Sequence, residues 1–354
     1  MSKKILVLIF WGLIGFIIAL SKSSEYNILP EYTFYGLLNE NISFIGTLVF
    51  SLLMISYLRT LKRENYQQYL QQSLDILPLG IFIAIIFTYY IRSEPKYWYG
   101  ILRQSFVGAD PNEFSCILAS LNAFILYGIY FSNNKIRIAL NIMVLFLSLF
   151  LITNITASKA GIIVFIFMII VFHSYLFKYI RPHKLTKKIL MLIIILIIIL
   201  NRISFEPIIS RFLGYQKIPY IQPIDYVTSG RYFTWIGGLK AFIKNPLIGY
   251  GGSDTSERVA IADILGKPVV AHNLYLSALL QYGIISFLIF ITMIFEILKK
   301  SKNCLGFNPL VFPFVISLNT LLFAGLTLNW FKREILWFFI SVVSSSILRE
   351  NINE

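Results

Sequence analysis

Long apolar runs, separated by short and mostly basic polar segments, are the dominant pattern along the chain. A helix needs about 20 apolar residues to cross a bilayer, and windows of this kind predict about ten membrane spans. The predicted spans cover residues 5–20, 42–58, 74–91, 112–131, 136–153, 159–177, 187–203, 271–297, 308–328 and 333–348. The first run has the charge and length of a signal peptide, but "SKSSEY" after it offers no cleavage site, so we expect it to remain as a span. The predicted fold class is all-α: a polytopic membrane protein in which residues 1–354 form a single integral membrane domain.

One long segment, residues 204–270, interrupts this pattern between the seventh and eighth predicted spans. Connections of this length are usually functional or folded in their own right. In the stretch "SGRYFTWIGGLKAFIKNP", apolar residues recur at helical spacing, and Asn245-Pro246 supplies a stop signal. The stretch predicts an amphipathic helix that lies along the membrane surface.

The distribution of charge along the chain predicts its orientation in the membrane. The chain is 57% hydrophobic and carries a formal net charge of +14. A basic chain can bind nucleic acid, but these lysines and arginines lie between the apolar runs rather than along one stripe, so we expect no nucleic-acid partner. With the N-terminus inside, most basic residues of the short loops fall on the inner side. Both termini are therefore predicted to be cytoplasmic, and the loop 204–270 extracytoplasmic.

Neither cysteine chemistry nor a metal site is expected. Cys116 and Cys304 lack the spacing of a zinc site or a disulfide framework, and the predicted topology places them on opposite sides of the membrane. The carboxylates of the long loop are scattered, without metal-ligand spacing. They are Asp225, Asp254, Glu257 and Asp263. We therefore expect a metal-independent site without a cofactor.

The stretch "AHNLYLSALLQYG" opens the eighth predicted span with a histidine. His272 is the one histidine on the predicted outer face, and its ordinary pKa near neutrality suits general-base work. The positive end of the helix dipole should favour the neutral imidazole that a base requires. Asn273, Ser277 and Gln281 recur every four residues, so they should form a polar stripe facing the bundle interior or a water-filled cavity. The alternative is that His272 and Asn273 merely cap the helix.

Two cations at other helix starts are candidates for binding an anion. Ser158 is a plausible N-cap, so Lys159 begins a helix, where a cation opposes the dipole at a cost of about 0.3–1 kcal/mol. That cost is understandable if an anion such as phosphate binds there. Arg231 follows Gly230 at the start of the amphipathic helix, and its planar guanidinium suits a pair of phosphate oxygens. Arg211 would enlarge the basic surface. The alternative is that these side chains contact solvent or lipid headgroups.

A glycine-rich turn, "NPLIGYGGSD", follows the amphipathic helix. Gly249 and Gly251 permit a sharp turn or a close approach of the backbone to a ligand, although alone they are a weak phosphate-loop signal. The helix starts at Lys159, Arg231 and His272 all fall on the predicted outer face. Two cations and one potential base suit a reaction in which an anionic leaving group is held while a hydroxyl is deprotonated.

These residues resemble the bacterial O-antigen ligase and O-antigen or capsular polysaccharide repeat-unit polymerase family. The resemblance lies in "GRYFTWIGGLKAFIKNPLIGYG" (230–251) and "HNLYLSALLQYGIISF" (272–287). The family pattern is an Arg, a Trp four residues later, a Pro-x-x-Gly-x-Gly turn, and His-Asn opening a membrane helix. The stretches "ADPNEFSCILAS" (109–120) and "TASKAGI" (156–162) are similar to other helix starts of the family.

The resemblance implies an inverting, metal-independent glycosyl transfer from an undecaprenyl-diphosphate-linked oligosaccharide. The reaction would take place at the outer face of the bacterial cytoplasmic (inner) membrane. Arg231 and Lys159 would bind the donor's diphosphate, and His272 would activate or orient the acceptor hydroxyl. The residues that would position glycan or acceptor are Asn273, Tyr275, Gly249 and Gly251. The family usually has arginine at the position of Lys159. Lysine keeps the charge of arginine but loses its bidentate geometry.

The acceptor distinguishes two activities within this family. A ligase transfers the glycan to lipid A core, and a polymerase transfers it to another lipid-linked repeat unit. A short chain without an appended domain favours the polymerase of a capsule, exopolysaccharide or O-antigen pathway, with a flippase and a chain-length regulator as partners besides the lipid bilayer. The ligase stays open as an alternative. A lipid-linked oligosaccharide transporter is less favoured, since transporters usually show internal repeats and broken helices and this sequence shows no internal repeat. The third alternative is a membrane scaffold for other assembly proteins.

Overall fold

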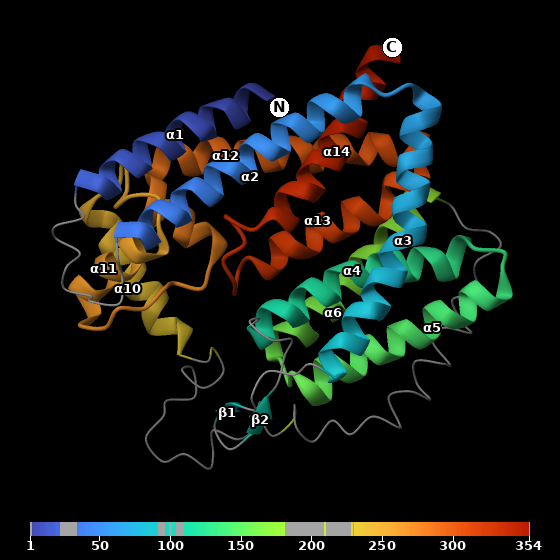
Figure 1. The fold of residues 1–354 in the computed structure, drawn as a ribbon, viewed down its shortest axis with the longest axis horizontal. Coiled ribbons are helices and arrows are strands. Elements are labelled where there is room, and N and C mark those ends of the chain that lie inside the picture. The colour runs from blue at the N-terminus through green and yellow to red at the C-terminus, as the bar shows by residue number, and fades with distance from the viewer. Residues whose placement is uncertain are drawn as a thin grey trace. The chain divides into compact units, whose positions relative to one another are not determined.

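The computed structural model is helical over nearly all of the residues that it describes (Figure 1). The described residues are 2–21, 34–90, 96–98, 101–103, 110–180, 209, 228 and 230–353. The predicted all-α class is confirmed. The chain divides into two compact units. The first unit consists of Met1–Thr60, Gln222–Ser301 and Gly325–Glu354, and the second of Leu61–Ile221 and Lys302–Ala324.

Six helices among the described residues are long and apolar enough to cross a membrane. They are Glu40–Thr60, Arg63–Thr88, Pro111–Phe131, Lys135–Ile155, Lys159–Tyr179 and Leu274–Gly306. Each coincides with a predicted span, so the chain is a multi-pass membrane protein. The predicted span 187–203 lies outside the described residues, and the one predicted over 308–328 contains a shorter apolar helix, Pro309–Ala324. The predicted number of spans is therefore not reached within the part of the chain that the structure describes.

The first unit contains α2 (Phe34–Thr60), which packs against both α1 (Ser2–Ser21) and α14 (Glu334–Asn353). The side-chain oxygens of Ser51 and Ser341 lie 2.6 Å apart and join α2 to α14. Its other helices are α10 (Arg231–Lys244), α11 (Asp254–Leu265) and most of α12 (Leu274–Phe307). The aromatic residues at its centre are Phe44, Tyr282, Phe290, Phe331 and Trp337.

The second unit is organised around α4 (Pro111–Phe131), which packs against α5 (Lys135–Phe150), α6 (Lys159–Tyr175) and α13 (Phe312–Ala324). Its other elements are α3 (Arg63–Tyr90), strands β1 (Lys96–Trp98) and β2 (Ile101–Arg103), the π-helical turns η2 (Leu151–Ile155) and η3 (Leu176–Ile180), and the 3-10 turn η5 (Pro309–Val311). The two strands form an antiparallel hairpin. The sequence did not predict this hairpin because three-residue strands are too short to show a period of two.

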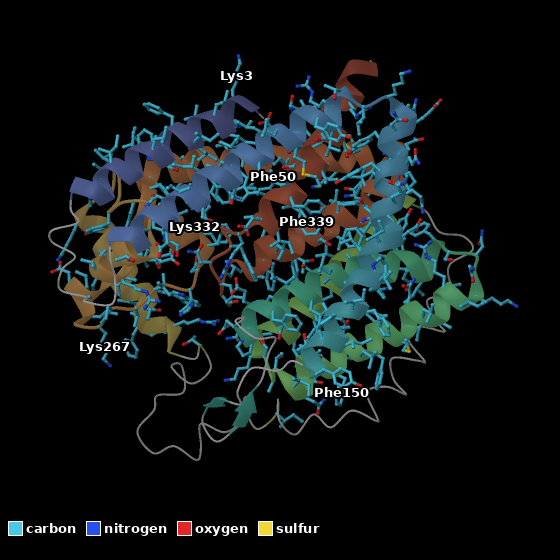
Figure 2. All side chains as sticks on the ribbon, viewed as in Figure 1. Lys3, Phe50, Phe150, Lys267, Lys332 and Phe339 are labelled. Carbon is cyan, nitrogen blue, oxygen red and sulfur yellow. The ribbon has the colours of Figure 1, made fainter. Side chains whose placement is uncertain are left out.

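Large apolar side chains point outward from helices of both units. Phe50 on α2 is 50% exposed and Phe150 on α5 is 37% exposed; both are labelled in Figure 2. A helix in a bilayer can expose such side chains without cost, because the lipid tails are themselves apolar. The polar Ser51, next to Phe50 in α2, is by contrast fully buried. This distribution is typical of a membrane protein, with apolar residues facing lipid and polar ones facing protein.

Capping residues explain where two helices of the second unit begin. The side chain of Asp110 accepts a hydrogen bond from the backbone of Asn112 at 2.8 Å, and Pro111 occupies the first turn of α4, where its missing N–H is harmless. The predicted N-cap of α6, Ser158, accepts a hydrogen bond from the backbone N–H of Gly161 at 3.0 Å. Ser158 also donates to Asn112 at 3.0 Å, so the starts of α4 and α6 lie together.

Helix α12 is interrupted at Gly283, whose φ of 73° and ψ of −179° are not helical. The interruption breaks the ladder of hydrogen bonds within the helix, and other segments of the first unit supply donors. The carbonyls of residues 280–282 accept, in order, from the N–H of Tyr250 at 2.8 Å, the N–H of Gly251 at 3.1 Å and the indole of Trp11 at 2.7 Å. Hydrogen bonds from other segments of the first unit therefore stabilise the break, which is a defined part of the structure of this unit.

Candidate functional site

Helix α10 is the predicted amphipathic helix, and Arg231 is its first residue. The preceding Gly230 has a φ of 80°, a left-handed conformation that favours glycine and lets the chain turn directly into the helix. Small residues pack inward, since a Cβ added to Gly238 would lie 2.9 Å from the Leu276 side chain. The large apolar residues that remain exposed are Phe233, Leu239 and Ile243. This exposed face supports the predicted position at the membrane surface, which stays a prediction.

Trp235 joins α10 to the segment before α12. Its indole N–H donates to the carbonyl of Ala271 at 2.9 Å. Arg231 lies one turn earlier on the same face of α10, because residues four apart in a helix are neighbours. Ala271 immediately precedes His272. The structure therefore brings Arg231 and His272 onto neighbouring segments of the first unit.

His272 is exposed and has a φ of 49°. This left-handed conformation is uncommon for residues other than glycine and costs about 1–3 kcal/mol, so it persists only where the surrounding structure imposes it. Two hydrogen bonds to Ala271 fix the chain before His272, and the cap of α12 fixes the chain after it. A strained, solvent-facing residue between two fixed neighbours is typical of a functional site.

Asn273, not His272, caps α12. Its side-chain oxygen accepts hydrogen bonds from the backbone of Tyr275 and of Leu276, each at 3.0 Å, and its amide donates to the carbonyl of Leu326 at 3.0 Å. The expectation that His272 itself opens the helix is therefore wrong by two residues, since α12 begins at Leu274. Capping explains Asn273 but does not explain why a histidine precedes it.

The polar stripe predicted below His272 faces the interior of the first unit. Ser277 and Gln281 are each 1% exposed. The side-chain amide of Gln281 donates to Glu257 at 2.8 Å and to Asp254 at 3.1 Å, both on α11. The stripe therefore meets carboxylates of the protein, a partnership that the sequence did not suggest.

Glu257 is a functional candidate that the sequence did not single out. It is fully buried, and its Oε1 accepts a hydrogen bond from the backbone N–H of Ala271 at 2.5 Å. Burial, together with the nearby charge of Asp254, raises the pKa of Glu257 to about 7. A signal was present in the sequence: Asp254 and Glu257 are three residues apart just after the Ser253 cap, so they share a face of α11.

Asp254 extends this cluster of carboxylates to α2. Its Oδ1 lies 3.3 Å from the ammonium of Lys332, which is also 3.6 Å from Glu40, and Figure 2 labels Lys332. Burial tends to raise the pKa of Asp254, but the charge and hydrogen bond of Lys332 outweigh it and hold the pKa below its ordinary value. The loop carboxylates are thus partly gathered rather than scattered. Asp263 instead pairs with Lys244 at 2.6 Å, and Asp225 lies outside the described residues.

The raised pKa of Glu257 predicts a dependence of stability on pH. The carboxyl holds its proton up to about pH 7 in the folded protein, compared with an ordinary pKa of 4.5. The folded state therefore binds more protons than the unfolded state in this window, and stability falls as pH rises through it. Glu257→Gln removes this titration. We expect the thermal midpoint of the wild type to fall more than that of E257Q between pH 5 and pH 8, measured in detergent; parallel curves would contradict the assignment.

The glycine turn after α10 packs against the break in α12. Gly249 has a φ of 71°, and a Cβ there would lie 2.6 Å from the carbonyl oxygen of Leu280. Gly251, with a φ of 114°, donates its N–H to the carbonyl of Gln281. The backbone N–H of Gly251 is thus used within the protein rather than offered to a phosphate. A role of Gly249 and Gly251 in positioning glycan remains a prediction.

Lys159 is a buried cation at the start of α6, in the second unit. It is 7% exposed, so it does not extend into the interface as a solvated lysine would. The preceding Ala157 has a left-handed φ of 42°. Ser115 and Thr156 hold the adjacent start of α4 through hydroxyls 2.6 Å apart. Because Lys159 belongs to the other unit, a common site with Arg231 stays a prediction.

Two further predictions can be placed. Tyr275 lies in the first turn of α12 and is partly buried, and its contact with a sugar stays a prediction. Arg211 lies outside the described residues. Within the described residues, no group of three or more His, Cys, Asp or Glu side chains is arranged to hold a metal ion. Metal independence stays a prediction.

Two comparisons with known proteins support the resemblance to the O-antigen ligase family. Residues 143–291 match the family model described as O-antigen ligase. Over 281 residues, the chain is 26% identical to the "Putative polysaccharide ligase" of Rickettsia typhi, and the alignment covers 75% of this chain and 64% of that protein. The matched region 143–291 contains Lys159, Arg231 and His272. Both comparisons name a ligase, so they favour the ligase alternative over the polymerase.

Proposed function

We propose that the chain, whose residues 143–291 match the family model described as O-antigen ligase, is a ligase that transfers a glycan from undecaprenyl diphosphate to lipid A core. The transfer takes place at the outer face of the cytoplasmic membrane, with both termini of the chain in the cytoplasm. It proceeds without a metal ion and inverts the anomeric centre. A flippase that delivers the lipid-linked glycan is a predicted partner.

The observation that carries this proposal is the strained conformation of His272. His272 is exposed and has a φ of 49°, while both of its neighbours are held by hydrogen bonds. Arg231 begins the helix whose Trp235 bonds to Ala271, so a fixed positive charge lies on the neighbouring segment. A base and a cation on adjacent segments suit a reaction in which a hydroxyl attacks while an anion leaves.

The proposed reaction assigns one task to each side chain. His272 accepts the proton of the acceptor hydroxyl as its oxygen bonds to the anomeric carbon from the face opposite the leaving group. The bond between that carbon and the diphosphate oxygen breaks, and undecaprenyl diphosphate leaves with the electron pair. Arg231 stabilises the charge that develops on the diphosphate, because its guanidinium can donate two parallel hydrogen bonds.

A transporter is the alternative of another class, and the break in α12 is a feature that transporters share. In transporters, such breaks leave backbone carbonyls that coordinate ions. Here the carbonyls of residues 280–282 accept hydrogen bonds from Tyr250, Gly251 and Trp11. The carbonyls of residues 280–282 are therefore already used within the protein, which favours the enzyme over the transporter.

The experiment uses purified protein, an undecaprenyl-diphosphate-linked oligosaccharide and two acceptors. We expect glycan on lipid A core, together with release of undecaprenyl diphosphate. Extension of a second lipid-linked unit, with lipid A core unused, would identify a polymerase instead. Translocation of the lipid-linked glycan across vesicle membranes without any new glycosidic bond would identify a transporter.

Arg231→Ala is expected to lower kcat/KM for the lipid-linked donor by about 100-fold, the usual cost of removing a group that stabilises developing charge. Arg231→Lys keeps the charge but loses the planar pair of donors, so we expect an intermediate rate. Steady-state assays over a range of donor concentrations measure both values. Lys240→Ala, at an exposed position of the same helix, is the matched control and should leave the rate unchanged. Equal rates for wild type and R231A would remove Arg231 from the site.

A further inference from the structure

The peptide group on each side of Ala271 is held by a different helix. The backbone N–H of Ala271 donates to Oε1 of Glu257 on α11 at 2.5 Å. Its carbonyl accepts from the indole of Trp235 on α10 at 2.9 Å. Ala271 is completely buried. The residue before His272 therefore cannot shift without breaking a buried hydrogen bond.

The chain after His272 is held equally closely. Asn273 donates to the carbonyl of Leu326 at 3.0 Å, and the N–H of Leu274 donates to the carbonyl of Gly325 at 2.7 Å. These contacts fix His272 at both ends, which is what a left-handed residue other than glycine requires. Of the two side chains that hold Ala271, Glu257 also bonds to the polar stripe, through Gln281.

We propose that Glu257 is a positioning residue for the transfer: by holding the backbone of Ala271 and the side chain of Gln281 together, it sets the direction of the His272 imidazole. This inference rests on the proposed function, in which His272 acts on the acceptor hydroxyl. Glu257 itself touches neither substrate nor reacting atoms, because it is fully buried beneath the segment. Small displacements of a catalytic group have large effects on rate, so a residue acting through Ala271 can affect turnover strongly.

The geometry explains why a long side chain with two acceptors occupies this position. Oε1 serves Ala271 and Oε2 serves Gln281, whose donor lies 2.8 Å away. Glutamine has the same length, and its one oxygen can serve Ala271. Its amide group could then donate to Oε1 of Gln281, a buried atom without a hydrogen-bond partner among the described residues. Aspartate keeps the carboxyl group but is one carbon shorter, so it cannot reach both partners.

Glu257→Gln keeps the length of the side chain without its carboxyl group, and Glu257→Asp keeps the carboxyl group on a shorter side chain. We expect E257Q to keep most of the wild-type kcat. We expect E257D to lose at least about tenfold in kcat, with the donor KM within about twofold of wild type, because the diphosphate site is untouched. The assay is the transfer to lipid A core described above. Asp263→Asn, on the same helix but exposed, is the matched control and should behave as wild type.

Hydrogen–deuterium exchange supplies a readout that does not depend on activity. The backbone amides of residues 271–276 should exchange faster in E257D than in wild type, and at the wild-type rate in E257Q. The proposal would be overturned if E257D kept the wild-type kcat and its amides at residues 271–276 exchanged as slowly as in wild type. It would also be overturned if E257Q lost as much kcat as E257D. If His272→Ala transfers glycan at the wild-type rate, the proposed function has failed, whereas the exchange measurements still decide whether Glu257 holds the segment.

Discussion

His272→Ala is expected to lower kcat by about 100-fold or more, the usual contribution of a general base. The imidazole is the one side chain between the two fixed neighbours Ala271 and Asn273, and it is exposed where an acceptor can reach it. The loss should appear in kcat rather than in the donor KM, because Arg231 is the group assigned to the donor. Single-turnover measurements with saturating lipid-linked donor test this directly.

The conformation of His272 makes the choice of control important. Alanine at a φ of 49° is strained, so H272A could disturb the backbone as well as remove the base. Asparagine tolerates the left-handed region better than most residues and has no group that titrates near neutrality. We therefore expect His272→Asn to fold and melt as the wild type does while remaining as inactive as H272A. Wild-type turnover in H272N would exclude an acid–base role for the imidazole.

Gly283→Ala is expected to destabilise the protein by about 3 kcal/mol or more, through backbone strain and steric overlap together. The φ of 73° with a ψ of −179° is a conformation that essentially only glycine adopts. An added Cβ would also lie 2.2 Å from the carbonyl oxygen of Leu247, a backbone atom that cannot simply rotate away. A lower thermal midpoint in detergent and a lower yield of monodisperse protein are the measurements.

Gly46→Ala is the matched control for this substitution. Gly46 lies in α2 of the same unit, and a Cβ there would meet no atom within 4 Å. Alanine is favoured over glycine inside a helix by about 0.5–1 kcal/mol, so G46A should be neutral or slightly stabilising. If G283A melted at the same temperature as G46A, the break in α12 would not have the rigid geometry described for it.

Signals of the local sequence predicted most of the helices and several of their starts. Apolar runs marked the membrane helices because the bilayer imposes both their length and their composition. The predicted cap at Ser158 and the stop at Asn245-Pro246 depend on groups within a few residues, and both are where the sequence placed them. The polar stripe of Ser277 and Gln281 followed from helical period alone.

Features that depend on distant segments could not be predicted in this way. The break at Gly283 lies inside an apolar run that reads as one helix, and it exists because residues 246–251 and Trp11 occupy the space beside it. Glu257 was passed over because its partners, Ala271 and Gln281, are 14 and 24 residues away. Spacing along the chain shows which residues share a helix face, but not which other helix that face meets.

The hydrogen bonds that follow His272 also set the minimum size of a working fragment. Leu274 and Asn273 donate to the carbonyls of Gly325 and Leu326, which lie beyond the matched family region 143–291. That region therefore contains the candidate reactive side chains but not everything that holds them in place. The family motif can be recognised in the sequence of residues 143–291 alone, whereas the geometry of the site also requires residues outside that region. Grafting or truncation guided by the motif alone would carry His272 away from two of its anchors.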